Sequence, residues 1–116
     1  MTRIPLMLLA FMAVASSVSA ESAVSIKTGL GTGEAYLNMS SREQRAYAIG
    51  VVNGMLLAPL FGAPKEKMLR IESCLVGMTD TQVAAILTKY LRENPGRWHE
   101  TPHVPMYAAL IETCPK

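Results

Sequence analysis

The sequence predicts an all-α protein, a small bundle of about four to five helices with one disulfide. Apolar residues recur at helical spacing, and no alternating strand pattern of useful length is present. Two capping-box motifs mark helix starts, because a Ser or Thr followed three residues later by Glu or Gln covers free amide groups. A pair of cysteines in the second half of the chain supplies the disulfide.

Residues 1–20 are typical of a removable export signal. Arg3 precedes an apolar run over about residues 4–15, and Val18-Ser19-Ala20 forms a small-x-small cleavage site. Retention as a membrane anchor is the alternative. Cleavage leaves 96 residues with ten basic and nine acidic side chains. This size and charge balance predict one domain over 21–116 and argue against a multi-domain enzyme and against nucleic-acid binding.

A flexible lead-in is predicted over residues 21–35. Gly29, Gly31 and Gly33 lie close together in it. Their spacing is not the G-x-G-x-x-G of a phosphate-binding loop, and no apolar strand precedes them. We therefore expect a flexible segment here and no nucleotide site.

The first predicted helix starts at Ser40, where Ser40-Ser41-Arg42-Glu43 is a capping-box pattern. No charged residue occurs from Ala46 to Ala63, a stretch that approaches the length of a membrane span. Glycine, asparagine and proline interrupt it, so we interpret it as a buried central helix, with no stable membrane insertion after signal cleavage. Gly50 and Gly54 would let a neighbouring helix approach closely.

A turn is predicted over residues 59–67, and a short helix or turn over 65–73 leads to the first cysteine. The clearest helix follows the capping box Thr79-Asp80-Thr81-Gln82. Asn94-Pro95-Gly96 ends it. Its apolar stripe has helical spacing and consists of Val83, Ile86, Leu87, Tyr90 and Leu91.

The last predicted element is a short helix from Pro105 to about Thr113. One face of it is apolar and consists of Val104, Tyr107, Ala108 and Ile111. Cys114 follows directly and would tie the end of this helix back to Cys74. An exported pair of cysteines with no odd partner most simply forms one disulfide. Closing a loop of about 40 residues stabilises a fold by about 4 kcal/mol in the chain-entropy model.

No catalytic or metal-binding set is visible in the sequence. His99-Glu100-Thr101-Pro102-His103 matches the H-E-x-x-H pattern of zinc proteases, which requires one continuous helix. Pro102 and Pro105 oppose that helix, and the mature chain has no third histidine. No nucleophile–base pair or close pair of carboxylates stands out. We therefore expect neither an enzyme nor a cofactor.

Arg97, Trp98 and His99 are the candidate partner-binding residues. They follow a helix stop and include the only tryptophan of the chain. Trp and Arg are enriched in binding hot spots, which favours contact with a partner. The alternative is that Trp98 folds back over the core and that its indole N–H finds a backbone carbonyl.

Several motifs resemble those of one known family when they are taken in order. The resemblance covers about residues 34–116 and rests on an aromatic-apolar-glycine helix, a cysteine followed by Gly-x-Thr and Gln, a Tyr-Leu…Pro helix end and a cysteine-containing C-terminal stretch. On these motifs the chain resembles the Rap/Tai immunity family. The residues that carry the motifs include Tyr47, Gly50, Gly54, Cys74, Gln82, Tyr90, Leu91, Pro95, Trp98 and Cys114.

This resemblance implies an all-α periplasmic protein of Gram-negative bacteria. Members of the family bind and block peptidoglycan-cleaving amidase effectors of type VI secretion systems, and some look like homodimers. An amidase is therefore the expected partner, and a homodimer is one expected assembly. Many relatives carry additional cysteines near the first helix, whereas Ala46 and its neighbours offer none.

A periplasmic chaperone or stress protein of the small, disulfide-bonded, acid-activated helical type is the alternative function. Such a chaperone needs conditional exposure of apolar surface, for which Ala46–Ala63 would be a source. Acid release works best when many carboxylates lose their charge, and this chain has only nine. The sequence therefore favours the immunity function.

Overall fold

The computed structural model describes residues 31–114. The predicted signal of residues 1–20, the lead-in up to residue 30 and residues 115–116 lie outside this part of the chain. Residues 31–114 form five α-helices and two short 3-10 helices, with no strand among them, as the sequence predicts. The elements are α1 (Gly33–Leu37), α2 (Ser41–Leu56), η1 (Ala58–Phe61), α3 (Lys65–Leu75), α4 (Asp80–Glu93), η2 (Pro95–Arg97) and α5 (His103–Thr113).

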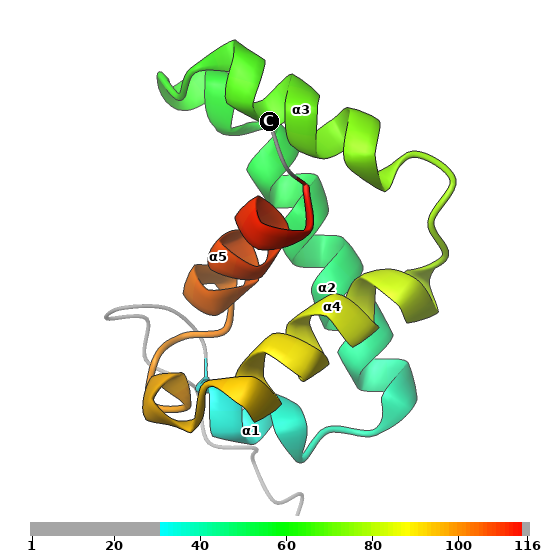
Figure 1. Cartoon of the computed structure of the whole chain (residues 1–116), viewed down its shortest axis with the longest axis vertical. Coiled ribbons are helices and arrows are strands. Elements are labelled where there is room, and N and C mark those ends of the chain that lie inside the picture. The colour runs from blue at the N-terminus through cyan, green and yellow to red at the C-terminus, as the bar shows by residue number, and fades with distance from the viewer. Residues whose placement is uncertain (1–30, 115–116) are drawn as a thin grey trace, which may run out of the picture.

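Helices α2 and α4 form the centre of the bundle. Helix α5 packs on both of them, α1 packs on α4, and α3 packs on α2 and η1 (Figure 1). Every one of the five α-helices places at least one side chain in a single apolar core. That core consists of Tyr36, Ala48, Val52, Met68, Ile71, Val83, Ala84, Leu87, Leu91, Met106 and Leu110.

Both predicted capping boxes are confirmed. Ser40 Oγ accepts the amide of Glu43, whose carboxylate accepts the amide of Ser40 at 2.8 Å, so α2 begins one residue later. Thr79 and Gln82 make the equivalent pair of bonds at the start of α4. The predicted stripe of α4 faces the core, with Ile86 half-buried and the other four residues buried. The helix ends at Glu93, directly before Asn94 and Pro95.

Helix α2 is central but is not buried on all sides. Ala48 and Val52 are buried, whereas Gly50, Asn53 and Gly54 are exposed. A Cβ atom added at Gly50 or Gly54 would meet no atom within 4 Å, so the expected close approach of a neighbouring helix to these glycines is wrong within the described structure. None of the described helices combines the length and the apolar character needed to cross a membrane.

The predicted lead-in differs from the structure at its C-terminal end, because α1 starts at Gly33. Thr32 caps this helix by accepting the amide of Ala35 at 3.1 Å. Gly33 is buried, and its amide donates to the Glu100 carbonyl at 2.8 Å. A Cβ atom here would lie 2.9 Å from Leu91 Cδ2, so the glycine permits close packing instead of flexibility.

Tyr36 anchors α1 to the core. Its side chain is fully buried, and its hydroxyl donates to the Ala84 carbonyl at 3.1 Å. The same oxygen lies 3.2 Å from Thr88 Oγ1, and the ring lies 5.6 Å from that of Tyr47, centroid to centroid. Burial raises the pKa of Tyr36, an effect that the hydrogen bond with Thr88 opposes. The tyrosine therefore stays neutral and locks α1 across α4.

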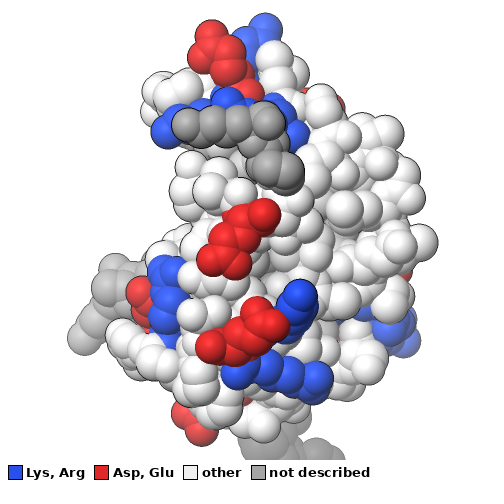
Figure 2. Space-filling view, in the orientation of Figure 1, with Lys and Arg blue, Asp and Glu red and all other residues white. Residues whose placement is uncertain are grey.

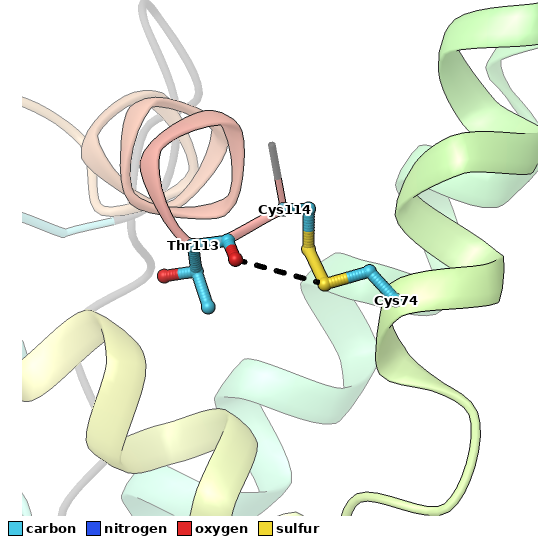
Figure 3. Close-up of a disulfide and its surroundings, with 3 residues drawn as sticks. All are labelled: Cys74, Thr113 and Cys114. Carbon is cyan, nitrogen blue, oxygen red and sulfur yellow. Dashed lines mark hydrogen bonds between the residues drawn. A yellow bond between two sulfur atoms is a disulfide. The ribbon is translucent and has the colours of Figure 1, made fainter. Parts of the chain in front are cut away.

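The predicted disulfide joins Cys74 near the end of α3 to Cys114 directly after α5 (Figure 3). The Cα atoms lie 5.6 Å apart. The contact between Cys74 Sγ and the Thr113 carbonyl at 3.9 Å is no conventional hydrogen bond, because a disulfide sulfur carries no proton. The bridge ties α3 to the end of α5, and α3 otherwise packs mainly on α2 and η1.

Helix α5 begins at His103, two residues before the predicted start. Its buried face consists of Pro105, Met106, Ala109 and Leu110. The apolar face predicted from the sequence lies on the opposite side of the helix. Val104, Tyr107 and Ile111 of that face are 42%, 38% and 44% exposed.

Candidate protein-binding site

The turn after α4 holds the three candidate partner-binding residues, and its tryptophan packs inward. Trp98 is half-buried against the core, and its indole N–H donates to the Leu91 carbonyl at 2.6 Å. The Trp98 carbonyl accepts the amide of Glu34 at 3.1 Å, and its Cα lies 3.2 Å from the Cβ position of Gly33. These contacts agree with the core-cover interpretation of the indole.

Arg97 is held by its own neighbours in the same turn. Its Nε donates to the Glu100 carboxylate at 2.6 Å, and its Nη1 donates to the Tyr90 hydroxyl at 2.6 Å. The guanidinium carbon also lies 5.6 Å from the centroid of the Tyr90 ring. Glu100 and then Tyr90 raise the pKa of Arg97, so the cation is permanent. Arg97 therefore closes the turn, and His99 is the exposed member of the three.

The H-E-x-x-H residues do not share a helix. His99 lies in the turn before α5, and His103 is the first residue of α5. Within residues 31–114, no group of three or more His, Cys, Asp or Glu side chains could hold a metal ion. The zinc-protease arrangement, in which both histidines lie on one helical face, is therefore not formed.

Some residues that carry the family resemblance lie in the core, at helix ends or in the disulfide, and others lie on an open surface. Tyr90 and Leu91 are buried, Tyr47 is half-buried beside Tyr36, and Gln82 closes a capping box. Pro95 begins η2, and the disulfide uses both cysteines. In contrast, Gly50 and Gly54 lie on an open surface of α2. Most of these residues therefore have a structural role.

The two most exposed large apolar side chains within residues 31–114, Phe61 and Leu60, lie at the connection between α2 and α3. We call residues 57–61 the apolar tip, in which Leu57, Leu60 and Phe61 are 54%, 78% and 86% exposed. The sequence predicts a turn here, and the tip is not among the predicted partner-binding residues. The available signal was a pair of large apolar residues, Leu60 and Phe61, between a proline and a glycine in a chain segment without charges.

Comparison with protein-family models, with curated proteins and with solved structures found no match to this chain. What the protein binds therefore has to be inferred from its own motifs and surfaces. The candidate surfaces are the apolar tip, the outer face of α5 and His99.

Proposed function

We propose that this protein is a periplasmic immunity protein, which binds and blocks a peptidoglycan-cleaving amidase effector of a type VI secretion system. The proposal combines the resemblance of residues 34–116 to the Rap/Tai family with one structural observation, the uncovered apolar tip. An inhibitor of this kind covers the active site of an enzyme. It therefore needs a complementary surface and no catalytic groups of its own.

The apolar tip has the properties of an interface hot spot. Phe61 and Leu60 are nearly fully exposed and adjacent in sequence, and no charged residue lies within residues 57–61. A contiguous exposed apolar patch on a small domain marks an interaction site. Large anchors of this type contribute most when a pocket of the partner buries them completely.

The backbone of the tip is ordered before any partner binds. Gly62 ends η1 with a left-handed φ of +97°, and its amide donates to the Pro59 carbonyl at 3.2 Å. The amide of Ala63 donates to the Ala58 carbonyl at 3.1 Å and closes the segment. A preordered segment loses less conformational freedom on binding, so more of its contact energy remains as affinity.

The disulfide fits a place of action outside the cytoplasm. Disulfides persist in oxidising compartments such as the bacterial periplasm. An amidase that cleaves peptidoglycan meets its substrate in the same compartment, so its inhibitor has to be exported there. The predicted signal over residues 1–20 would provide that export.

The alternative of an acid-activated chaperone has less support. Acid activation requires an apolar surface that carboxylate contacts hide at neutral pH. The apolar tip is already exposed, and the three ion pairs within residues 31–114 are all partly accessible to solvent. Protonating the carboxylates of these ion pairs at acid pH would therefore uncover little apolar surface.

Periplasmic co-expression with the amidase encoded beside this gene tests the proposal. The wild-type chain is compared with Leu60→Ser/Phe61→Ser at the tip and with Leu69→Ser/Val76→Ser as a matched control. Leu69 and Val76 are large, exposed side chains of α3 and its C-cap, 48% and 76% exposed. We expect the wild type and the control to restore survival and to co-purify with the amidase. The tip variant should lose affinity by about 30-fold or more, because two hot-spot anchors are removed.

Two outcomes would count against the proposal in different ways. A wild-type chain that neither protects the host nor forms a complex with the amidase, or a gene with no such neighbour, contradicts the immunity function. A tip variant that protects as well as the wild type contradicts only the role of residues 57–61. Circular dichroism of each variant shows whether the fold is retained.

A further inference from the structure

A groove lies between α3 and α5 on the outside of the bundle. Its volume is about 340 Å³, and we call it the α3–α5 groove. Because Cys114 forms part of its lining and is bonded to Cys74 of α3, the disulfide holds its two walls together (Figure 3). The lining consists of Lys67, Arg70, Ile71, Tyr107, Ile111 and Cys114.

Both cations of the groove are unpaired within the described structure. Lys67 and Arg70 lie one helical turn apart on α3, and neither has a carboxylate oxygen within 4.0 Å among residues 31–114. No carboxylate belongs to the described lining. Figure 2 shows basic side chains over α3 at the top of the view, with acidic side chains beside them. The described lining of the groove therefore carries two cations and no carboxylate, and an acidic residue of α3, Glu66, lines a neighbouring pocket with Arg70.

The apolar part of the groove continues along α5. Tyr107 and Ile111 line the groove. Val104 lies on the same face of α5, one turn before Tyr107 in the sequence. From Val104 to Ile111 the helix rises by about 10 Å. A buried residue, Ile71, forms the inner apolar wall. Cationic and apolar groups thus lie next to each other over a length of about two helical turns.

The size and charge of the groove limit what can occupy it. Its volume lies near the lower end of the range for small-molecule pockets, about 300–1,000 Å³, which is room for one or two side chains. The exposed stripe of α5 extends beyond it, which favours an extended chain as the ligand. A second copy docked by two-fold symmetry would bring the same cations of both copies to one interface, which is unfavourable. An acidic partner is favoured by charge complementarity.

We propose that the α3–α5 groove binds a short segment of a partner protein in which an Asp or Glu stands beside a large apolar residue. The carboxylate pairs with Lys67 and Arg70, and the apolar side chain packs between Ile71 and Ile111. This goes beyond the proposed function, because the groove shares no residue with the apolar tip and its chemistry does not depend on the partner being an amidase.

Selection from a random decapeptide library displayed on phage tests this proposal without a known partner. The wild-type chain is the bait, and the selected peptides are then measured against variants by fluorescence anisotropy. Lys67→Glu/Arg70→Glu reverses the charge of the groove. Lys89→Glu/Arg92→Glu is the matched control, because it makes the same charge change at two exposed residues of α4. Ile111→Ser tests the apolar wall.

We expect selected peptides to be enriched in Asp or Glu beside Leu, Ile, Phe or Trp. Their affinity should fall at least about tenfold with Lys67→Glu/Arg70→Glu and with Ile111→Ser, and stay within about twofold with the α4 control. Selection of no peptide, selection of peptides without a carboxylate, or equal binding to the charge-reversed groove would each overturn the proposal. The amidase assay is separate, so either proposal can fail while the other stands.

Discussion

Gly33 and Gly50 are both helical glycines, but their surroundings are opposite. Gly33 is buried where α1 meets Leu91 and the backbone of Trp98, and a Cβ atom would lie 3.2 Å from Trp98 Cα. Gly50 lies in the middle of α2, and a Cβ atom there would meet nothing within 4 Å. The first glycine is required by packing, whereas the second only lowers helix propensity.

Alanine substitutions at these two positions should therefore change stability in opposite directions. Gly33→Ala forces the Trp98 turn away from α1 and should cost about 1–3 kcal/mol of unfolding free energy, as overpacking does. Gly50→Ala should stabilise by about 0.5–1 kcal/mol, because the unfolded chain loses freedom and the helix gains propensity. Urea unfolding of the two variants and the wild type measures both. A Gly33→Ala variant as stable as the wild type would contradict the described contact.

Among single residues, the sequence predicts the helix caps well and the Trp98 turn only in part. The caps depend on side chains three residues apart, so local spacing is sufficient to place them. The side-chain bonds of Trp98 and Arg97 reach residues seven positions away, and the Trp98 carbonyl bonds across to α1. Such contacts depend on how helices pack, and one sequence contains no direct signal for them.

At the scale of elements, α5 shows how a short apolar helix can mislead sequence analysis. Seven of its eleven residues are Val, Met, Tyr, Ala, Leu or Ile, so more than one face has apolar residues at helical spacing. The buried face includes Met106, Ala109 and Leu110, because α4 and α2 lie on that side. Helix α1 is missed for a related reason, since five residues give too short a pattern to recognise.

Two neighbouring residues of α5 test which face is buried. Leu110 is fully buried, whereas Ile111 is 44% exposed. Leu110→Ala should lower the free energy of unfolding by about 2–5 kcal/mol, because it removes core contacts and leaves a cavity. Ile111→Ala should cost less than about 1 kcal/mol. Thermal or urea unfolding distinguishes them, and equal losses for both variants would contradict the orientation of α5.

At the scale of the whole molecule, the disulfide links α3 to the pair formed by α4 and α5. Helix α3 packs on α2 and η1, and the apolar tip lies directly before it in the chain. Because the loop closed by Cys74 and Cys114 contains the whole of α4 and α5, the bridge restrains nearly half of the described chain. It also holds the two walls of the α3–α5 groove together.

Removing the bridge should therefore destabilise the fold strongly. Cys74→Ser/Cys114→Ser should lower the free energy of unfolding by about 4 kcal/mol, the chain-entropy value for a loop of this length. Urea unfolding measures this loss. Alkylation of the wild-type protein without reductant, read by intact mass, should label no cysteine. Two labelled cysteines, or a serine variant of unchanged stability, would contradict the structural role of the bridge.

The global features that could be predicted from the sequence are those that depend on composition and local pattern. Fold class, the starts of α2 and α4 and the disulfide pair belong to this group. The exposure of the apolar tip and the α3–α5 groove do not, because both depend on which surfaces the packed helices cover and leave open. The sequence alone does not distinguish the exposed Phe61 from the buried Leu110, because both are large apolar residues.

The central claim, that this protein blocks an amidase through its apolar tip, is tested most directly with purified components. Release of peptides from peptidoglycan by the amidase encoded beside this gene is measured while the mature chain is titrated in. We expect activity to disappear as the inhibitor approaches stoichiometric amounts, and Leu60→Ser/Phe61→Ser to leave most activity at the same ratio. Full amidase activity at an approximately tenfold excess of the wild-type chain would contradict the claim.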